Sequence, residues 1–173
     1  MKNIVLIGFM GTGKTTTGRI LANQLGRTFI DIDQEIEAKC KLRVEEIFAI
    51  HGEPFFREQE RCAIQAVSRY DNAVVATGGG AVLYPENVKW LKQNSVVICL
   101  QAAPEVILRR VENDKVQRPL LKRPDKLQAI EQLLQERTRH YAVADFAIET
   151  STITPLRVSE LIIGFLRARG ELA

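Results

Sequence analysis

The sequence contains few of the residues that build metal clusters or disulfide frameworks. It has two histidines and three cysteines among its 173 residues. Cys40, Cys62 and Cys99 have neither the CxxC spacing of zinc sites nor the even number typical of a secreted disulfide framework. We interpret them as reduced structural thiols. His51 and His140 are isolated in the sequence, with no third ligand, and both are interpreted as structural.

Long apolar runs are also missing, and the net charge is small. No eighteen consecutive residues are apolar, and the apolar N-terminal segment ends at Gly8, before it reaches the length of a signal-peptide core. These features predict a cytoplasmic protein without a membrane partner. With 24 Lys and Arg against 21 Asp and Glu, the charge balance does not suggest a nucleic-acid partner, although basic residues can still gather around a small acidic substrate. No long apolar helix face indicates an interface, and we expect a monomer.

Length and composition predict one globular domain over residues 1–173. The chain is long enough to bury a sizeable core, and its 46% hydrophobic and 26% charged residues are typical of a folded protein. Segments with strand composition alternate with helical segments. The expected strands are 2–7, 28–32, 73–76, 95–100 and 146–148, and the expected helices include 14–25, 34–39 and 44–69, with a break at 51–54. This order predicts a three-layer α/β/α fold around a mainly parallel sheet.

The stretch GFMGTGKT, from Gly8 to Thr15, has the full spacing of a nucleotide-binding P-loop. It lies between an expected strand and an expected helix, which is the context that the motif requires. The glycines let successive backbone N–H groups turn inward, and the helix N-terminus adds partial positive charge for bound phosphates. Lys14 is expected to reach the β- and γ-phosphates of a nucleoside triphosphate, and the hydroxyl of Thr15 is expected to be a ligand of Mg²⁺.

The P-loop alone does not distinguish hydrolases, switches and kinases. The sequence contains neither the NKxD nor the DxxG motif of a signalling GTPase. A large ATPase motor would need a longer chain. A small-molecule kinase therefore fits best, and the residues that bind the phosphate acceptor are expected elsewhere in the chain.

Candidate acceptor residues follow the second and third expected strands. Asp31 and Asp33 lie two residues apart, so in an extended chain both carboxylates would point to one face of the sheet, beside the P-loop. One is expected to hold a magnesium-bound water and the other to accept a proton from the attacking hydroxyl. The alternative is that Asp33 caps the following helix. The glycines of TGGGA, at 77–81, indicate a ligand close to the backbone, and the alternative there is an adaptable loop.

Three arginines are candidates for binding an anion. Arg57 and Glu60 lie at i and i+3 in an expected helix, which by itself indicates only a surface ion pair. Arg118 lies in the polar segment 112–125, which contains two prolines and is expected to form a mobile lid. There it would offset charge on the transferred phosphate, or else be a solvated loop arginine. Arg137 belongs to a basic cluster at a helix end, where the helix dipole explains about half of the charge.

Six motifs of this chain have the same order and spacing as the motifs of a known family. They are GFMGTGKT at 8–15, DID at 31–33, FFRE at 55–58, TGGGA at 77–81, RPLL at 118–121 and ERTRHY at 136–141. Taken together they resemble the shikimate kinase family over nearly the whole chain. The resemblance implies a nucleoside-monophosphate-kinase-like fold with a five-stranded parallel sheet, a substrate-binding region at about 33–61 and a lid at about 112–125. It also implies ATP-dependent phosphorylation of the 3-hydroxyl of shikimate, a step of aromatic amino acid biosynthesis.

The resemblance further implies roles for individual residues. The partners it implies are MgATP and shikimate, with Mg²⁺ as cofactor. The implied nucleotide site consists of Gly11, Thr12, Gly13, Lys14, Thr15, Thr16, Arg110 and Arg118, with Thr15 and, through water, Asp31 at the metal. The implied shikimate site consists of Asp33, Arg57, Gly79, Gly80 and Arg137, and the implied catalytic residues are Lys14, Asp33 and Arg118.

Two of these assignments stay open at this point. Arg110 resembles the family's adenine-stacking arginine, but the lid length between it and Arg118 varies, and Arg109 is the alternative. The family often has ERxPLY, whereas this chain has Arg139 where proline is common, so Arg139 is a candidate helper of Arg137. Other interpretations of the whole chain are a related kinase that acts on an acyclic acid such as gluconate, and a nucleotide-binding regulator without catalysis.

Overall fold

The computed structural model of the protein describes residues 1–114, 119–121 and 124–172. The strands are β1 (Asn3–Ile7), β2 (Thr28–Asp31), β3 (Ala73–Ala76), β4 (Ser95–Gln101) and β5 (Phe146–Glu149). The α-helices are α1 (Lys14–Leu25), α2 (Ile32–Cys40), α3 (Val44–Val67), α4 (Pro85–Lys92), α5 (Pro104–Asn113), α6 (Lys126–Tyr141) and α7 (Pro155–Ala168). Two short 3₁₀ helices, η1 (Ala81–Leu83) and η2 (Pro119–Leu121), complete the described elements.

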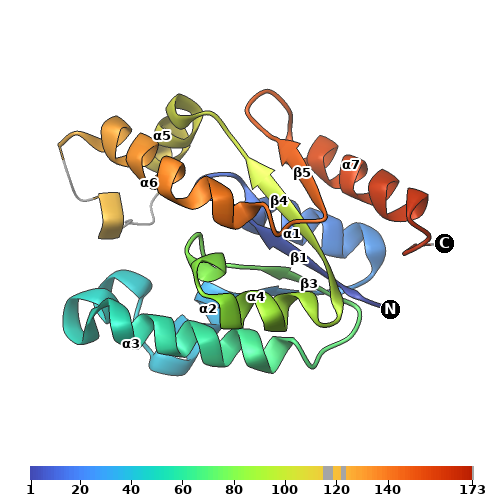
Figure 1. Ribbon diagram of the computed structural model, residues 1–173, viewed down its shortest axis with the longest axis horizontal. Helices are drawn as coiled ribbons and strands as arrows, with labels where there is room; N and C mark the ends of the chain where they lie inside the picture. The colour runs from blue at the N-terminus through green and yellow to red at the C-terminus, as the bar shows by residue number, and fades with distance from the viewer. Residues whose placement is uncertain (115–118, 122–123, 173) are drawn as a thin grey trace.

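The strands form one parallel sheet in the order β2-β3-β1-β4-β5 (Figure 1). Strand β1 lies at the centre of the sheet, and all of its residues are buried. Each strand is connected to the next in sequence through at least one helix, as parallel pairing requires. Because the strands are parallel, their carboxyl ends meet at one edge, where α/β proteins bind their ligands. The loops that follow β1 and β3 and the start of α2 after β2 are therefore neighbours in space.

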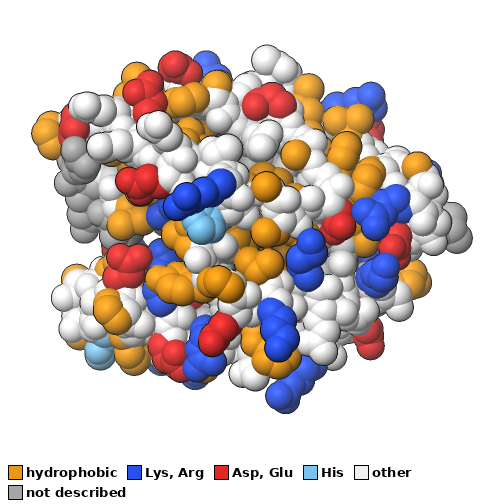
Figure 2. Space-filling model, viewed as in Figure 1, with side chains coloured by type: hydrophobic (Ala, Val, Ile, Leu, Met, Phe, Trp, Pro, Cys, Tyr) orange, Lys and Arg blue, Asp and Glu red, His pale blue; other side chains and the backbone are white. Residues whose placement is uncertain are grey.

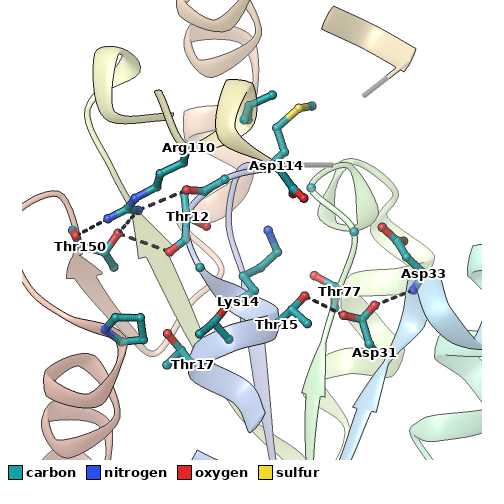
Figure 3. A pocket seen from close by; sticks show the side chains of 18 of the residues that line it. Thr12, Lys14, Thr15, Thr17, Asp31, Asp33, Thr77, Arg110, Asp114 and Thr150 are labelled. Atoms are coloured by element: carbon teal, nitrogen blue, oxygen red, sulfur yellow. Dashed lines mark hydrogen bonds between the residues drawn. The ribbon is translucent and has the colours of Figure 1, made fainter. Parts of the chain in front are cut away.

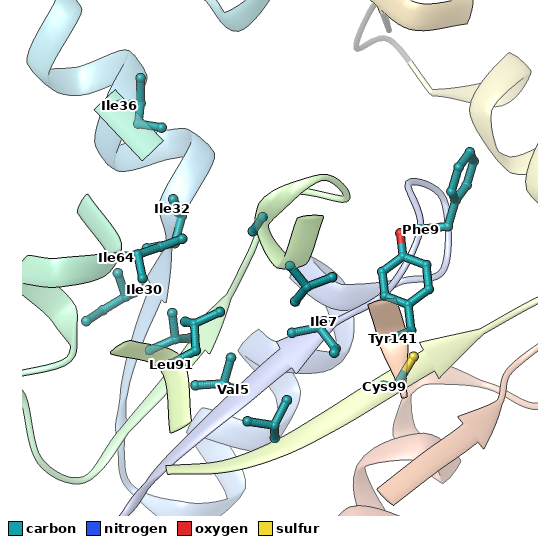
Figure 4. Packing of buried hydrophobic residues seen from close by; sticks show 14 of the residues in the cluster. Val5, Ile7, Phe9, Ile30, Ile32, Ile36, Ile64, Leu91, Cys99 and Tyr141 are labelled. Atoms are coloured by element: carbon teal, nitrogen blue, oxygen red, sulfur yellow. The ribbon is translucent and has the colours of Figure 1, made fainter. Parts of the chain in front are cut away.

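Helices cover both faces of the sheet, and each face has its own hydrophobic cluster. Alternation along β1 sends Ile4 and Leu6 to one cluster and Val5 and Ile7 to the other. The first cluster packs against α1 and α7. The second, larger cluster packs against α2, α3, α4 and α6 (Figure 4). Burial on both faces holds the strands in place, so the loops at their carboxyl ends start from fixed positions.

The fold expected from the sequence is confirmed as a three-layer α/β/α arrangement with a five-stranded parallel sheet. Helix α1 and strand β3 have the expected bounds. The long helix that begins at Val44 is broken at Gly52 (φ +81°, ψ 168°), inside the expected break at 51–54. A glycine is suited to this break because φ lies in the region that other residues rarely adopt.

The geometry expected for the two aspartates at the end of β2 is wrong. Strand β2 ends at Asp31 and α2 begins at Ile32, so Asp31 and Asp33 are not neighbours on an extended strand. The cause is local, because the side chain of Asp31 accepts hydrogen bonds from the backbone N–H groups of Asp33 at 3.1 Å and Gln34 at 3.4 Å. The N-cap of α2 is therefore Asp31, and the alternative in which Asp33 caps this helix is also wrong.

The segment expected to form the lid is described only in part. Helix α5 reaches Asn113, η2 lies at Pro119–Leu121 and α6 begins at Lys126, while Arg118 lies outside the described residues. In the part of the chain that the structure describes, no helix combines the length and apolar character needed to span a membrane. Figure 2 shows Lys and Arg interspersed with Asp and Glu over the visible face of the molecule.

Candidate active site

A cavity of about 740 Å³ opens at the carboxyl edge of the sheet (Figure 3). Its walls come from the P-loop and the first turn of α1, from the end of β2, from the segment after β3, from the end of α5 and from the start of α7. Every nucleotide-site residue expected from the sequence that the structure describes lies along this cavity, while Arg118 lies outside the described residues. The fold therefore brings together residues that are more than a hundred positions apart in the chain.

The backbone of the P-loop requires glycine at particular positions. Gly8, Gly11 and Gly13 all have positive φ, at +136°, +73° and +90°. At Gly8 a β-carbon would also collide with the carbonyl oxygen of Leu100 in β4. Gly13 directly precedes α1, and no side chain in the described part of the protein caps the first N–H groups of this helix. These N–H groups and the helix dipole favour an anion at this end of the cavity.

The side chain of Lys14 folds back onto the P-loop and bonds to its backbone. Its side chain is buried, and Nζ donates hydrogen bonds of 2.8 Å to the carbonyl oxygens of Gly8 and Phe9. The buried hydroxyl of Thr12 donates to the same Phe9 oxygen, also at 2.8 Å. These bonds hold the ammonium group beside the N–H groups of the loop, so positive charge is concentrated where a phosphate would bind.

Thr15 and Asp31 form the oxygen-rich side of the cavity. The hydroxyl of Thr15 donates a hydrogen bond to Oδ2 of Asp31 at 2.7 Å, and the Oδ1 atom of Asp31 is the one that caps α2 (Figure 3). A hydroxyl and a carboxylate are hard oxygen donors, which fit Mg²⁺. The described residues contain no group of three or more His, Cys, Asp or Glu side chains that could hold a metal. This donor set suits a cation that keeps most of its waters and also binds phosphate oxygens.

The glycines at 78–80 lie where four charged side chains converge. A β-carbon on Gly78 would lie 2.7 Å from Oε1 of Glu60 and 3.0 Å from Oδ1 of Asp33. A β-carbon on Gly79 would lie 3.6 Å from Nη1 of Arg137 and 3.2 Å from the backbone nitrogen of Met10 in the P-loop. A β-carbon on Gly80 would lie 2.7 Å from Nη2 of Arg57. The expected acceptor-site residues are thus brought together around one backbone segment that contacts the P-loop.

Arg57 and Glu60 form an ion pair that is not on the surface. Nη1 of Arg57 donates to Oε2 of Glu60 at 2.9 Å, and the Glu60 side chain is 0% exposed. Nη2 of Arg57 also pairs with Glu53 at 3.0 Å, toward solvent. Burial raises the pKa of Glu60, and the charge and hydrogen bond of Arg57 oppose this shift. The interpretation of Arg57 and Glu60 as a surface pair is wrong, because α3 turns this face toward the glycine segment.

Arg137 is buried at the end of α6, whereas Arg139 is exposed. Its guanidinium lies over the ring of Phe9, with Cζ 5.5 Å from the ring centroid. One turn later on the helix, the hydroxyl of Tyr141 donates to the carbonyl oxygen of Gly79 at 2.7 Å. The burial of Arg137 beside Gly79 distinguishes it from Arg139, and this difference could not be seen in the sequence.

Arg110 lies on the opposite side of the cavity from Asp33. Its guanidinium donates to the carbonyl oxygen of Gly11 at 3.2 Å and to the hydroxyl and carbonyl oxygens of Thr150 at 3.0 and 2.7 Å (Figure 3). Arg109 lines the same cavity, so both candidates for an adenine contact lie at this site. Thr150 could not be recognised from the sequence, because it follows β5 and meets Arg110 of α5 only in the folded chain.

A parallel sheet with a P-loop after its central strand, and a second charged site beside that loop, define a P-loop kinase. The family model for shikimate kinase matches residues 10–167. The shikimate kinase of Caldicellulosiruptor saccharolyticus is 48% identical over 169 residues, which cover 98% of each chain. That of Pelotomaculum thermopropionicum is 50% identical over 167 residues, 96% of each chain. A solved shikimate kinase from Acinetobacter baumannii in complex with shikimate has a TM-score of 0.93 at 38% identity, over 98% of this chain and 94% of that one. The chain belongs to the shikimate kinase family.

Proposed function

We propose that this protein transfers the γ-phosphoryl group of ATP to the 3-hydroxyl of shikimate, yielding shikimate 3-phosphate and ADP in aromatic amino acid biosynthesis. Membership of the shikimate kinase family supports this reaction. The structural observation that carries the proposal is the convergence of Arg57 and Arg137 on the glycine segment next to the P-loop. Two largely buried guanidinium groups are suited to bind one small carboxylate, which shikimate has at one end of its ring.

On the donor side, the ATP phosphates would bind to the P-loop. The residues from Gly11 to Thr16 line the cavity, so their N–H groups would bind the phosphates, and Lys14 would supply positive charge to the β- and γ-phosphates. The hydroxyl of Thr15 and, through water, the carboxylate of Asp31 would hold Mg²⁺. Bound Mg²⁺ offsets the negative charge that develops during phosphoryl transfer. Arg110 would lie against the nucleotide base.

On the acceptor side, Arg57 and Arg137 would hold the carboxylate while the backbone of Gly79 and Gly80 lines the ring. Asp33 belongs to both halves of the site, because it lines the nucleotide cavity and also lies beside Gly78. This position supports a role in which Asp33 would accept the proton of the attacking hydroxyl or orient it. Holding the carboxylate end of the ring would direct the hydroxyl at the other end toward the γ-phosphorus, which is a gain from orientation rather than from covalent chemistry.

Three further assignments complete the proposal. Arg118, in a lid at about 112–125, would approach the transferred phosphate when the site closes. The residues at 33–61 would act as the substrate-binding region of a single domain. The enzyme is proposed to work as a cytoplasmic monomer without a nucleic-acid or membrane partner, which agrees with its small net charge of +3.

The test is coupled ADP release from MgATP with shikimate, gluconate or a nucleoside monophosphate as acceptor. We expect release only with shikimate, loss of release on chelation with EDTA and recovery on addition of Mg²⁺. Mass spectrometry of the product identifies the phosphorylated compound. Turnover with gluconate alone would reassign the acceptor, and ATP binding without turnover of any acceptor would indicate a regulator rather than an enzyme.

A further inference from the structure

The hydroxyl of Tyr141 joins the last turn of α6 to the glycine segment after β3. Tyr141 Oη donates to the carbonyl oxygen of Gly79 at 2.7 Å, across 62 positions in the chain. The ring is buried in the larger hydrophobic cluster, where it lies beside Cys99 of β4 with its hydroxyl at the far end (Figure 4). The ring therefore has an ordinary packing role, and only the hydroxyl reaches the site.

The bond to Gly79 constrains the direction of the next N–H group. A peptide unit is planar and trans, so the carbonyl of Gly79 and the N–H of Gly80 point in opposite directions. With the carbonyl held by Tyr141, the N–H of Gly80 is directed away from that hydroxyl. Within the described residues, no backbone acceptor takes up this N–H. The guanidinium of Arg57 lies against the same glycine, so Gly80 lies in the proposed acceptor site.

The same hydroxyl also forms a hydrogen bond with Arg137, which lies one turn earlier on α6. Burial raises the pKa of Tyr141 to about 12, and the charge of Arg137 and its hydrogen-bonding contact with the phenol oppose this shift. The phenol therefore remains protonated at any physiological pH and can donate to Gly79 throughout that range. Nη1 of Arg137 lies 3.6 Å from the position that a Gly79 β-carbon would occupy. The hydroxyl of Tyr141 thus contacts both the carbonyl of Gly79 and the guanidinium of Arg137.

We propose that Tyr141 is a positioning residue for the acceptor: its hydroxyl holds the Gly79–Gly80 peptide and Arg137 in one arrangement in which both face the substrate. The inference rests on the proposed function and adds a residue that does not itself touch the reacting atoms. Tyr141→Phe keeps the ring and its packing but removes the donor. The carbonyl of Gly79 then loses its partner, and the peptide that follows is free to turn.

The kinetic test compares Tyr141→Phe with Ser159→Ala. Ser159 is also buried, and its hydroxyl bonds to Gln24 in the layer formed by α1 and α7, so this control loses a buried hydroxyl far from the glycine segment. We expect Tyr141→Phe to raise KM for shikimate about tenfold, with KM for MgATP and kcat changed less than about twofold. Ser159→Ala is expected to lower thermal stability while leaving both KM values unchanged.

A second measurement does not depend on the substrate. The N–H groups of Ala81 and Leu83 bond to the carbonyls of Gly78 and Gly80 at 3.2 and 3.1 Å, so their hydrogen exchange reports on the glycine segment. In Tyr141→Phe both amides should exchange faster, while those of β1 do not change. If the wild-type protein does not phosphorylate shikimate, the proposed function is wrong. The exchange rates still test whether Tyr141 holds the glycine segment in place, because they require no substrate. Unchanged exchange, or an active variant with a wild-type KM for shikimate, would overturn the inference.

Discussion

Replacement of Arg57 by methionine is expected to impair shikimate binding and folding through two separable effects. The variant would lose the charge-assisted hydrogen bonds from Arg57 to the substrate carboxylate, which together contribute about 1.5–3 kcal/mol of binding free energy. This loss corresponds to a rise of about 10- to 150-fold in KM for shikimate. KM for MgATP should change little, because Arg57 does not line the nucleotide cavity. Removal of Arg57 also leaves the fully buried carboxylate of Glu60 without its partner at 2.9 Å. Breaking a buried pair in this way costs about 3–5 kcal/mol of unfolding free energy.

The double variant Arg57→Met/Glu60→Gln separates the two effects. The amide of glutamine has a similar shape and no charge, so the double variant should recover most of the lost unfolding free energy, measured by urea denaturation. It should not recover shikimate binding, because the guanidinium is still missing. Glu60→Gln alone serves as the matched control for the loss of the carboxylate.

The pH dependence of stability provides a further check on Glu60. Burial raises the pKa of this carboxyl above its ordinary value of 4.5, and Arg57 opposes the shift. A carboxyl with a raised pKa binds more protons in the folded state, so its contribution to stability is lost as pH rises through the folded pKa. Without Arg57 the pKa should rise further, and stability should fall more steeply above about pH 4.5 than in the wild type. Parallel pH profiles, or equal loss of affinity for shikimate and MgATP, would refute this reasoning.

Three further predictions concern single residues. Lys14→Met should lower kcat/KM about 10²- to 10³-fold with little effect on thermal stability, and near-normal turnover in a coupled assay would contradict the assignment of Lys14 to the phosphates. Gly80→Ala should raise KM for shikimate severalfold and leave KM for MgATP unchanged, because the new β-carbon would lie 2.7 Å from the Arg57 guanidinium and displace it. A wild-type KM for shikimate would show that Arg57 can move away from the β-carbon without loss of substrate binding. Cys99 is buried and its pKa is raised to about 11 by burial, so it should resist Ellman's reagent at pH 8 while the partly exposed Cys40 and Cys62 react, and labelling of all three thiols in the folded protein would argue against this.

Much of the fold and of the phosphate site follows from contiguous sequence. The P-loop is encoded within eight residues, because strand, glycines, lysine and helix start are adjacent in the chain. Helix α1 and strand β3 have the bounds expected from composition and turn residues. The break at Gly52 is also predicted locally, since a glycine followed two positions later by a proline favours the interruption of a helix.

The tertiary structure decided what depends on segments that are distant in the chain. Glu60 has a spacing typical of a surface pair, and its burial is set by the packing of α3 beside the glycine segment. Arg137 is buried and Arg139 is exposed because the rest of the protein covers only one side of α6. The bond from Tyr141 to Gly79 joins two elements that no local pattern connects. The amino-acid sequence by itself determined which chemical groups are present and which secondary structures they favour. Their burial, pKa shifts and mutual contacts depend on the whole packed chain, because each is a property of the surroundings of a residue rather than of the residue itself.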